Sequence, residues 1–235
     1  MKKKVLVTGA SRGIGASISE KLAIEGYDVY GTSTSGKGLT FGVNKWVIGD
    51  FSSDKGIKDF LLLLNQLPVF DVLINNAGIN IIKPQENISS NDYEMIQNIN
   101  LKAPYQIAQY LAKSMALKGG GKIIHIASIW SVISKSNRSL YSTMKTGLIG
   151  LTRASAVEWA SRDVLINAIS PGFVETDLTK ASLTKNQQSL MKDQIPLKRF
   201  ALPHEIAELV YFLSSDKNTY ITGQNIIIDG GFTIV

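Results

Sequence analysis

Three polar side chains near the middle of the chain have the types and spacing that acid–base chemistry needs. Tyr141 and Lys145 are four residues apart, so on a helix they share one face. Ser128 follows the apolar run Ile123–Ala127, which is typical of a buried strand. A phenol, with an ordinary pKa of about 10, exchanges protons more readily near neutral pH when a cation stabilises its anion. The pattern therefore predicts that the three side chains converge, with Lys145 lowering the pKa of Tyr141.

A glycine-rich segment near the start of the chain has the order of elements that a phosphate site requires. The apolar run Val5–Val7 leads into Thr8–Gly15, whose glycines are spaced G-x-x-x-G-x-G, and a helical pattern follows over Ala16–Gly26. Glycines let the main chain approach a pyrophosphate, and the N–H groups at the helix start face it. The alternative is a tight connection that binds nothing.

The order of motifs along the chain resembles the short-chain dehydrogenase/reductase family. Members carry T-G-x-x-x-G-x-G, N-N-A-G, a catalytic Asn, a Ser, Y-x-x-x-K and P-G in that order. The matching segments here are Thr8–Gly15, Asn75–Gly78, Asn100, Ser128, Tyr141 with Lys145, and Pro171–Gly172. Within the family the chain is most similar to the 3-oxoacyl-acyl-carrier-protein reductase group, through Gly31–Ser35, Pro171–Asp177 and Tyr220–Gly223. The resemblance implies an NAD(P)-dependent oxidoreductase that acts on CH–OH groups.

The resemblance also implies a role for each matching residue. Tyr141 is the general acid in ketone reduction and the base in alcohol oxidation, while Ser128 donates a hydrogen bond to the substrate oxygen. Lys145 binds the nicotinamide ribose as well, and Asn100 holds a water that joins Lys145 to solvent. The implied cofactor contacts are Gly9, Ser11, Arg12, Gly13, Ile14, Gly15, Thr32, Asp50, Phe51, Asn76, Ala77, Gly78, Tyr141, Lys145, Pro171, Gly172, Val174 and Thr176.

The end of the second strand indicates the cofactor. An acidic residue there hydrogen-bonds the ribose 2′-hydroxyl and favours NAD. Here the segment Val29–Ser33 contains no carboxylate. Arg12 and Lys37 can instead neutralise a 2′-phosphate, with Thr32 as a donor, although plain surface charge is the alternative reading of both cations. We therefore expect NADP(H).

Seven apolar runs separated mostly by helix-length segments indicate the fold. Most runs are too apolar to have a wetted face, which is typical of a parallel sheet covered on both sides. We expect one doubly wound Rossmann-type α/β domain over residues 1–235, with a seven-stranded, mostly parallel sheet. The runs are Val5–Val7, Asp28–Tyr30, Trp46–Ile48, Val72–Ile74, Lys122–Ile126, Leu165–Ile169 and Asn225–Ile228.

Composition argues against several other classes of protein. The net charge is +6 and the pI is near 9.3, but the lysines are scattered, so we expect a solvated basic surface and no nucleic-acid partner. No apolar stretch could cross a bilayer and no signal peptide is evident, which predicts a cytoplasmic protein. There is no cysteine, and the two histidines are interpreted as a packed strand residue (His125) and a helix start (His204), so we expect no metal.

The substrate contacts are expected between Ser128 and Tyr141 and after the P-G motif. Trp130, Arg138 and Phe173 are the candidates, and residues 177–200 are predicted to form a lid. Arg138 and Trp130 could hold a carboxylate or phosphate and stack on a sugar ring, or only line the rim.

The substrate itself is expected to be a 3-oxoacyl thioester on an acyl carrier protein. Arg162 matches one carrier-binding position of that group, but Lys118–Lys122 has glycine where the group is rich in arginine. A sugar acid, polyol or sugar derivative is therefore the alternative, and a nucleotide-sensing scaffold is the non-enzyme alternative. Two C-terminal segments, Tyr220–Gly223 and 225–235, resemble the part of the family that forms homotetramers, and the alternative is an ordinary edge strand.

Overall fold

The seven apolar runs form one seven-stranded sheet. The computed structural model describes residues 2–38, 40–176, 179 and 184–235. The strand order is β3-β2-β1-β4-β5-β6-β7, and every neighbouring pair is parallel. The strands are β1 (Lys4–Val7), β2 (Asp28–Ser33), β3 (Val43–Ile48), β4 (Val72–Asn75), β5 (Gly121–Ile126), β6 (Val164–Pro171) and β7 (Asn225–Ile228). The predicted doubly wound fold is confirmed, and the sheet is parallel throughout.

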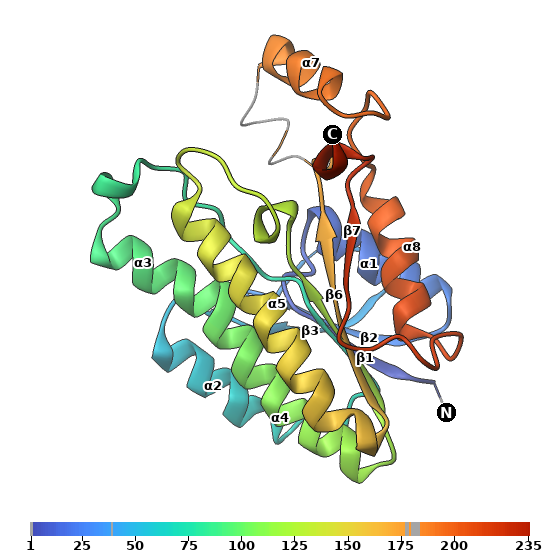
Figure 1. Cartoon of the computed structure of the whole chain (residues 1–235). Helices are drawn as coiled ribbons and strands as arrows, with labels where there is room; N and C mark the ends of the chain where they lie inside the picture. The colour runs from blue at the N-terminus through green and yellow to red at the C-terminus, as the bar shows by residue number, and fades with distance from the viewer. Residues whose placement is uncertain (1, 39, 177–178, 180–183) are drawn as a thin grey trace.

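Helices cover both faces of the sheet (Figure 1). Helices α1 and α8 pack together on one face, and α2, α4 and α5 lie on the other. The helices are α1 (Gly13–Ile24), α2 (Asp54–Leu64), α3 (Ser90–Gln97), α4 (Ala103–Leu117), α5 (Ser139–Trp159), α7 (Lys185–Asp193) and α8 (Pro203–Ser214). Short 3₁₀ turns lie at Gln85–Asn87, Ile129–Ser131, Ala160–Arg162 and Phe232–Ile234, and a π-helical turn lies at Asn98–Lys102.

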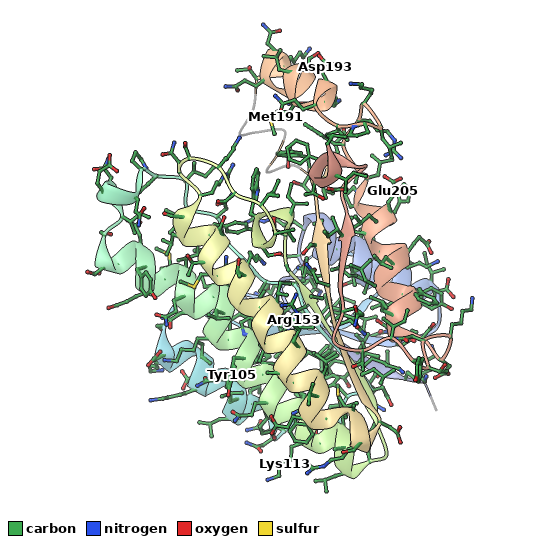
Figure 2. The ribbon with its side chains drawn as sticks, viewed as in Figure 1. Tyr105, Lys113, Arg153, Met191, Asp193 and Glu205 are labelled. Carbon is green, nitrogen blue, oxygen red and sulfur yellow. The ribbon has the colours of Figure 1, made fainter. Side chains whose placement is uncertain are left out.

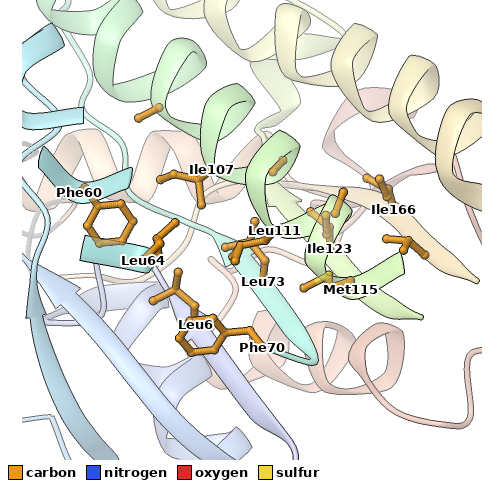
Figure 3. Packing of buried hydrophobic residues seen from close by; sticks show 14 of the residues in the cluster. Leu6, Phe60, Leu64, Phe70, Leu73, Ile107, Leu111, Met115, Ile123 and Ile166 are labelled. Carbon is orange, nitrogen blue, oxygen red and sulfur yellow. The ribbon is translucent and has the colours of Figure 1, made fainter. Parts of the chain in front are cut away.

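Strand β1 shows why the two faces need two sets of helices. Side chains alternate along a strand, so Val5 and Val7 pack with α1 and α8 while Leu6 packs with α2 and α4. All three are fully buried. Figure 3 shows Leu6 in the apolar cluster between the sheet and the helices α2 and α4, to which Phe60 of α2 and Ile107 of α4 contribute. Packing on both faces fixes the strands, and their carboxyl ends form one rigid edge.

That carboxyl edge is where a ligand is expected in such a sheet. The chain order reverses between β1 and β4, which are neighbours in space, and open α/β sheets bind ligands at this switch point. The motif segments follow β1, β4, β5 and β6, so all of them lie on this edge. No helix in the described residues is long and apolar enough to cross a membrane.

Helix α7 was not predicted from the sequence. Thr184 begins it with a capping box, in which the Thr184 hydroxyl accepts from the Gln187 N–H and the Gln187 side chain accepts from the Thr184 N–H. None of its residues is buried, so it has no apolar stripe to reveal it. It projects beyond the carboxyl end of β6, and Met191 and Asp193 mark it in Figure 2. The predicted lid lies partly outside the described residues, at 177–178 and 180–183.

Candidate active site

The glycine-rich turn after β1 is tied to the segment that follows β4. Thr8 Oγ1 accepts hydrogen bonds from the backbone N–H groups of Asn76 and Ala77, each at 3.0 Å. Asn76 Nδ2 donates to the carbonyl oxygens of Thr8 at 2.9 Å and Gly9 at 3.0 Å. A Cβ on Gly15 would lie 2.2 Å from the Gly9 oxygen and 2.4 Å from Asn76 Nδ2, so only glycine fits there. The predicted turn and the N-N-A-G segment therefore form one unit.

The start of α1 is open to an anion. Gly9 and Gly13 have φ values of +66° and +57°, which glycine tolerates best. Arg12 precedes the helix without capping it, and the first turn contains no acidic residue. Because the first N–H groups of a helix carry positive partial charge, this end suits a phosphate. Thr176 lies beside the turn, with its methyl carbon 3.5 Å from where a Cβ of Gly13 would be.

Two of the expected cofactor contacts have side chains that face the protein interior. Thr32 is buried, and its hydroxyl accepts from the Gly9 N–H at 3.1 Å, so it supports the glycine turn instead of facing a 2′-phosphate as expected. Phe51 is buried and packs edge-on against Phe60, with ring centroids 5.1 Å apart. Asp50 beside it is exposed.

The cations expected near a 2′-phosphate are both on the surface. Arg12 and Lys37 are exposed, and neither makes a salt bridge within the described residues. Ser33 holds the loop that carries Lys37, since its hydroxyl donates to the Lys37 carbonyl at 2.7 Å and accepts from the Lys37 N–H at 3.0 Å. The side chain of Lys37 remains free to meet an anion.

The three residues singled out for acid–base chemistry meet at the end of β5. Ser128 follows the strand, and its side chain is close enough to the phenol of Tyr141, from α5, to lower the pKa of that phenol. Lys145, one turn further along α5, has its Nζ atom 5.7 Å from the centre of the Tyr141 ring. That Nζ atom donates to the carbonyl oxygen of Ile126 at 2.7 Å. Strand end and helix face thus deliver the three groups together.

Burial dominates the proton affinities at this point. Burial raises the pKa of Tyr141 to about 12, against the opposing effects of the Ser128 side chain and the Arg138 charge. This differs from the expectation that Lys145 lowers the pKa of Tyr141. Burial also lowers the pKa of Lys145 to about 8, because the interior disfavours its charged form. Tyr141 is therefore a protonated phenol at neutral pH.

Asn100 lies on the π-helical turn between α3 and α4. It is fully buried, its Oδ1 accepts from the Ile79 N–H at 2.9 Å, and its Nδ2 donates to the Ile79 carbonyl at 2.8 Å. A Cβ on Gly78 would lie 3.6 Å from both Asn100 Oδ1 and Lys145 Nζ. The bare face of Gly78 thus leaves a space bordered by Asn100 and Lys145. Wider helical turns of this kind are frequent at functional sites.

A buried polar pair lies below the site and was not predicted as part of it. His125 is fully buried, as expected, and its Nδ1 is 3.1 Å from Asn75 Nδ2, which also donates to the Pro104 carbonyl at 3.1 Å. Burial, with a smaller effect from the Lys145 charge, lowers the pKa of His125 to about 3. It is therefore neutral and cannot serve as the base.

Aromatic rings form a wall beside Ser128. Trp130 contacts Phe173 edge-on with centroids 6.1 Å apart, and Phe173 contacts Phe232 at 5.2 Å and Phe200 at 5.8 Å. Arg138 lies over the Trp130 ring, with Cζ 5.5 Å from its centre. The structure thus brings Trp130, Phe173 and Arg138 together as expected. It adds Phe200 and Phe232, which only the fold places there.

The remaining expected contacts lie where β6 ends. Pro171 closes that strand, and the Gly172 N–H donates to the Ile228 carbonyl of β7 at 2.9 Å. Val174 is buried, and its carbonyl accepts from the N–H of Thr176 and from the hydroxyl of Thr179. This segment therefore runs from the sheet edge to the glycine turn.

The fold and site define a doubly wound, nucleotide-binding α/β protein, and known proteins of this kind match it along its length. A family model described as enoyl-(acyl carrier protein) reductase matches residues 9–233. A 3-oxoacyl-acyl-carrier-protein reductase from Aquifex aeolicus is 37% identical, over 97% of this chain and 96% of its own. The chain belongs to the short-chain dehydrogenase/reductase family and is an oxidoreductase of that family.

Solved structures agree with this assignment. One is described as an NAD(P)-dependent gluconate 5-dehydrogenase from Beutenbergia cavernae with bound NADP at low occupancy. It has a TM-score of 0.90 at 32% identity, over 99% of this chain and 97% of that one. Another is a mutant 4-hydroxyisoleucine dehydrogenase complexed with NADH and succinate, with a TM-score of 0.92 at 31% identity, over 99% of both chains.

Proposed function

We propose that this chain is an NADP(H)-dependent carbonyl reductase and alcohol dehydrogenase. The observation that carries the proposal is the meeting of Ser128, at the end of β5, with Tyr141 and Lys145, which share one face of α5. This group lies at the sheet edge that also carries the glycine turn. A proton donor, an oxygen-binding donor and a nucleotide site are the protein parts that such a reaction needs.

Each residue has a definite task in the proposed reaction. A nicotinamide nucleotide, when bound, supplies a hydride to a carbonyl carbon or accepts one from an alcohol carbon. Ser128 donates a hydrogen bond to the substrate oxygen, where negative charge grows in the transition state. Tyr141, protonated at neutral pH, gives its proton to that oxygen in reduction and takes it back as phenolate in oxidation. Lys145 holds the nicotinamide ribose, and Asn100 fixes the loop beside it.

The residues around the glycine turn fit a nucleotide with a 2′-phosphate. Helix α1 offers an uncapped N-terminus, and the missing side chains of Gly13 and Gly78 leave room for a ligand. Strand β2 ends at Ser33 without a carboxylate that would hold a free 2′-hydroxyl. Arg12, exposed at the turn, is the cation that would meet the phosphate.

Two substrate classes have support. Relatives named 3-oxoacyl-acyl-carrier-protein reductase match nearly the whole chain and favour a 3-oxoacyl thioester. Arg162 lies over the Trp159 ring, with its Cζ atom 4.9 Å from the ring centre, and is the residue that would meet the acidic carrier. Fold neighbours that are gluconate dehydrogenases, or that hold succinate, favour a small carboxylate compound such as a sugar acid. The pairing of Arg138 with Trp130 suits this second class.

The region around α7 is proposed as a cover for the substrate. Phe200, at the end of the segment 177–200, contacts the aromatic wall through Phe173. A cover that excludes water strengthens the electrostatic effect of Ser128 and Tyr141 on the reacting oxygen.

A panel of ketones with either reduced nicotinamide nucleotide tests the proposal. We expect oxidation of NADPH, faster than that of NADH, with acetoacetyl thioesters, carrier-bound 3-oxoacyl thioesters or oxo acids. Arg12→Gln should weaken NADPH binding by about 10-fold or more and change NADH binding little, because it removes one charged phosphate contact. Binding of NADPH without turnover of any ketone would instead support the nucleotide-sensing alternative.

A further inference from the structure

Two donor atoms of Arg138 have no hydrogen-bond partner among the described residues. It is the residue before α5 and three residues before Tyr141. Its Nε and Nη1 atoms are buried without a hydrogen-bond partner. Its guanidinium lies over the Trp130 ring. A ring face accepts none of the hydrogen bonds that the N–H groups can donate in the guanidinium plane. Arg138 as a whole is half-buried, but buried donor atoms of a cation without an acceptor are unfavourable, and an anion that reached them would satisfy both.

The unpartnered guanidinium is close to the reacting groups. Its positive charge lowers the pKa of Tyr141, as does the nearby Ser128 side chain. Trp130, over whose ring Arg138 lies, comes two residues after Ser128, and its backbone N–H donates to the Ser128 hydroxyl at 3.3 Å. An anion on Arg138 would therefore belong to the same molecule whose carbonyl oxygen meets Ser128 and Tyr141.

The aromatic wall on which Arg138 lies carries further positive charge at both of its ends. Lys135 Nζ lies 5.7 Å from the centre of the Trp130 ring, and Lys192 Nζ lies 5.2 Å from that of Phe200. None of Lys135, Arg138 and Lys192 has a salt-bridge partner among the described residues. Cations at the rim of an aromatic wall attract small anions and offer little to an uncharged acyl chain.

We propose that Arg138 binds the carboxylate of the substrate, so that the ketone reduced by this chain is a short oxo acid. The proposal rests on the proposed function, and it narrows the substrate to the second of the two classes, the small carboxylate compounds. A planar guanidinium matches a carboxylate with two parallel hydrogen bonds and thereby fixes the carbonyl relative to Tyr141. The carbonyl carbon gains a hydride from the reduced nicotinamide nucleotide and its oxygen gains the Tyr141 proton, while the carboxylate is unchanged.

Pairs of oxo acids and their methyl esters isolate the carboxylate charge. Acetoacetate differs from methyl acetoacetate, and laevulinate from methyl laevulinate, by that charge and one methyl group. We expect the wild-type protein to use at least one acid about 10- to 100-fold better than its ester in kcat/KM, which is the range of a charged hydrogen bond. Arg138→Gln should remove this preference by lowering kcat/KM for the acid far more than for the ester, and its thermal unfolding shows whether the variant is folded. Equal use of acids and esters by the wild type would overturn the proposal.

Two further variants test whether carboxylate binding needs the planar guanidinium or only a positive charge. Arg138→Lys keeps the charge without the planar fork, so it should restore only part of the acid preference. Arg153→Gln is the control, because Arg153 is an exposed arginine on α5, the helix that follows Arg138 (Figure 2), and has no partner among the described residues. It should retain the full preference.

Calorimetric titration with succinate keeps this test separate from that of the proposed function. Succinate has no ketone, so its binding is independent of turnover. We expect binding to the wild-type protein, with or without NADP⁺, that is at least about 10-fold weaker in Arg138→Gln. If no ketone is reduced at all, the proposed function fails, yet this difference in binding still supports the carboxylate site. Absent binding, or equal binding by both proteins, would overturn it.

Discussion

Tyr141 is the residue on which the proposed chemistry depends most directly. Tyr141→Phe keeps the ring and removes the proton, so we expect kcat to fall by about 100-fold or more while the dissociation constant for NADPH changes little. Turnover assays and cofactor titration measure the two quantities. Tyr105→Phe is the control, since Tyr105 is a half-exposed phenol on the outer side of α4 (Figure 2). Near-normal turnover by Tyr141→Phe would contradict the mechanism.

The pKa of about 12 for Tyr141 predicts different pH profiles in the two directions. Reduction uses the phenol, which dominates at neutral pH, so its rate should stay level between about pH 6 and 8. Oxidation uses the phenolate, whose fraction rises as the pH approaches the pKa, so its rate should increase up to about pH 10. Initial rates in both directions across this range provide the test, and an oxidation rate independent of pH would argue against Tyr141 as the base.

The buried charge of Lys145 should lower the free energy of unfolding of the protein. Its pKa falls from an ordinary 10.5 to about 8, so the unfolded chain binds more protons between these values and stability rises with pH there. Below about pH 8 the folded protein bears the full penalty of a buried charge. Lys145→Met should therefore raise the free energy of unfolding by roughly 1–3 kcal/mol at pH 7, and by less near pH 10. Urea unfolding at both pH values measures this, and a destabilised variant at pH 7 would refute it.

At the scale of elements, the site depends on backbone contact between the glycine turn and the segment after β4. Gly15→Ala places a Cβ 2.2 Å from the Gly9 oxygen, so we expect a loss of about 2 kcal/mol or more in unfolding free energy and weaker NADPH binding. Thermal unfolding and cofactor titration report the two effects. Gly150→Ala on α5 is the control: its Cβ would meet nothing within 4 Å, and it should stabilise the helix by up to about 1 kcal/mol. Equal effects of the two changes would contradict the packing argument.

At the scale of the whole molecule, the C-terminal segment remains a predicted assembly surface. Tyr220 and Ile234 are 95% and 84% exposed, which is unusual for large apolar side chains. We expect sedimentation to give about four times the chain mass of 25.6 kDa. Ile234→Asp should reduce this mass, whereas Ile24→Asp, an equally apolar and exposed position at the end of α1, should not. A wild-type mass of one chain would exclude the tetramer.

The sequence by itself determined the sheet, the motif order and the family. Runs such as Val72–Ile74 are apolar on both faces, and only burial between two helix layers explains that pattern, so the strands were predictable from local composition. The spacing of Tyr141 and Lys145 on one helix face was likewise local information. Helix α7 was not predicted from the sequence because it buries no side chain and therefore has no periodic apolar pattern.

Only the tertiary structure decided how these residues behave. The pKa of Tyr141 depends on how deeply the ring is buried, a property of the surrounding elements that its neighbours in sequence do not specify. The inward turn of Thr32 depends on contact with Gly9, twenty-three residues away. Likewise Arg138 has unpartnered buried donors because Trp130 and α5 enclose it. Sequence spacing names the groups that can react, whereas burial and long-range packing set their charge, their partners and the ligand they can accept.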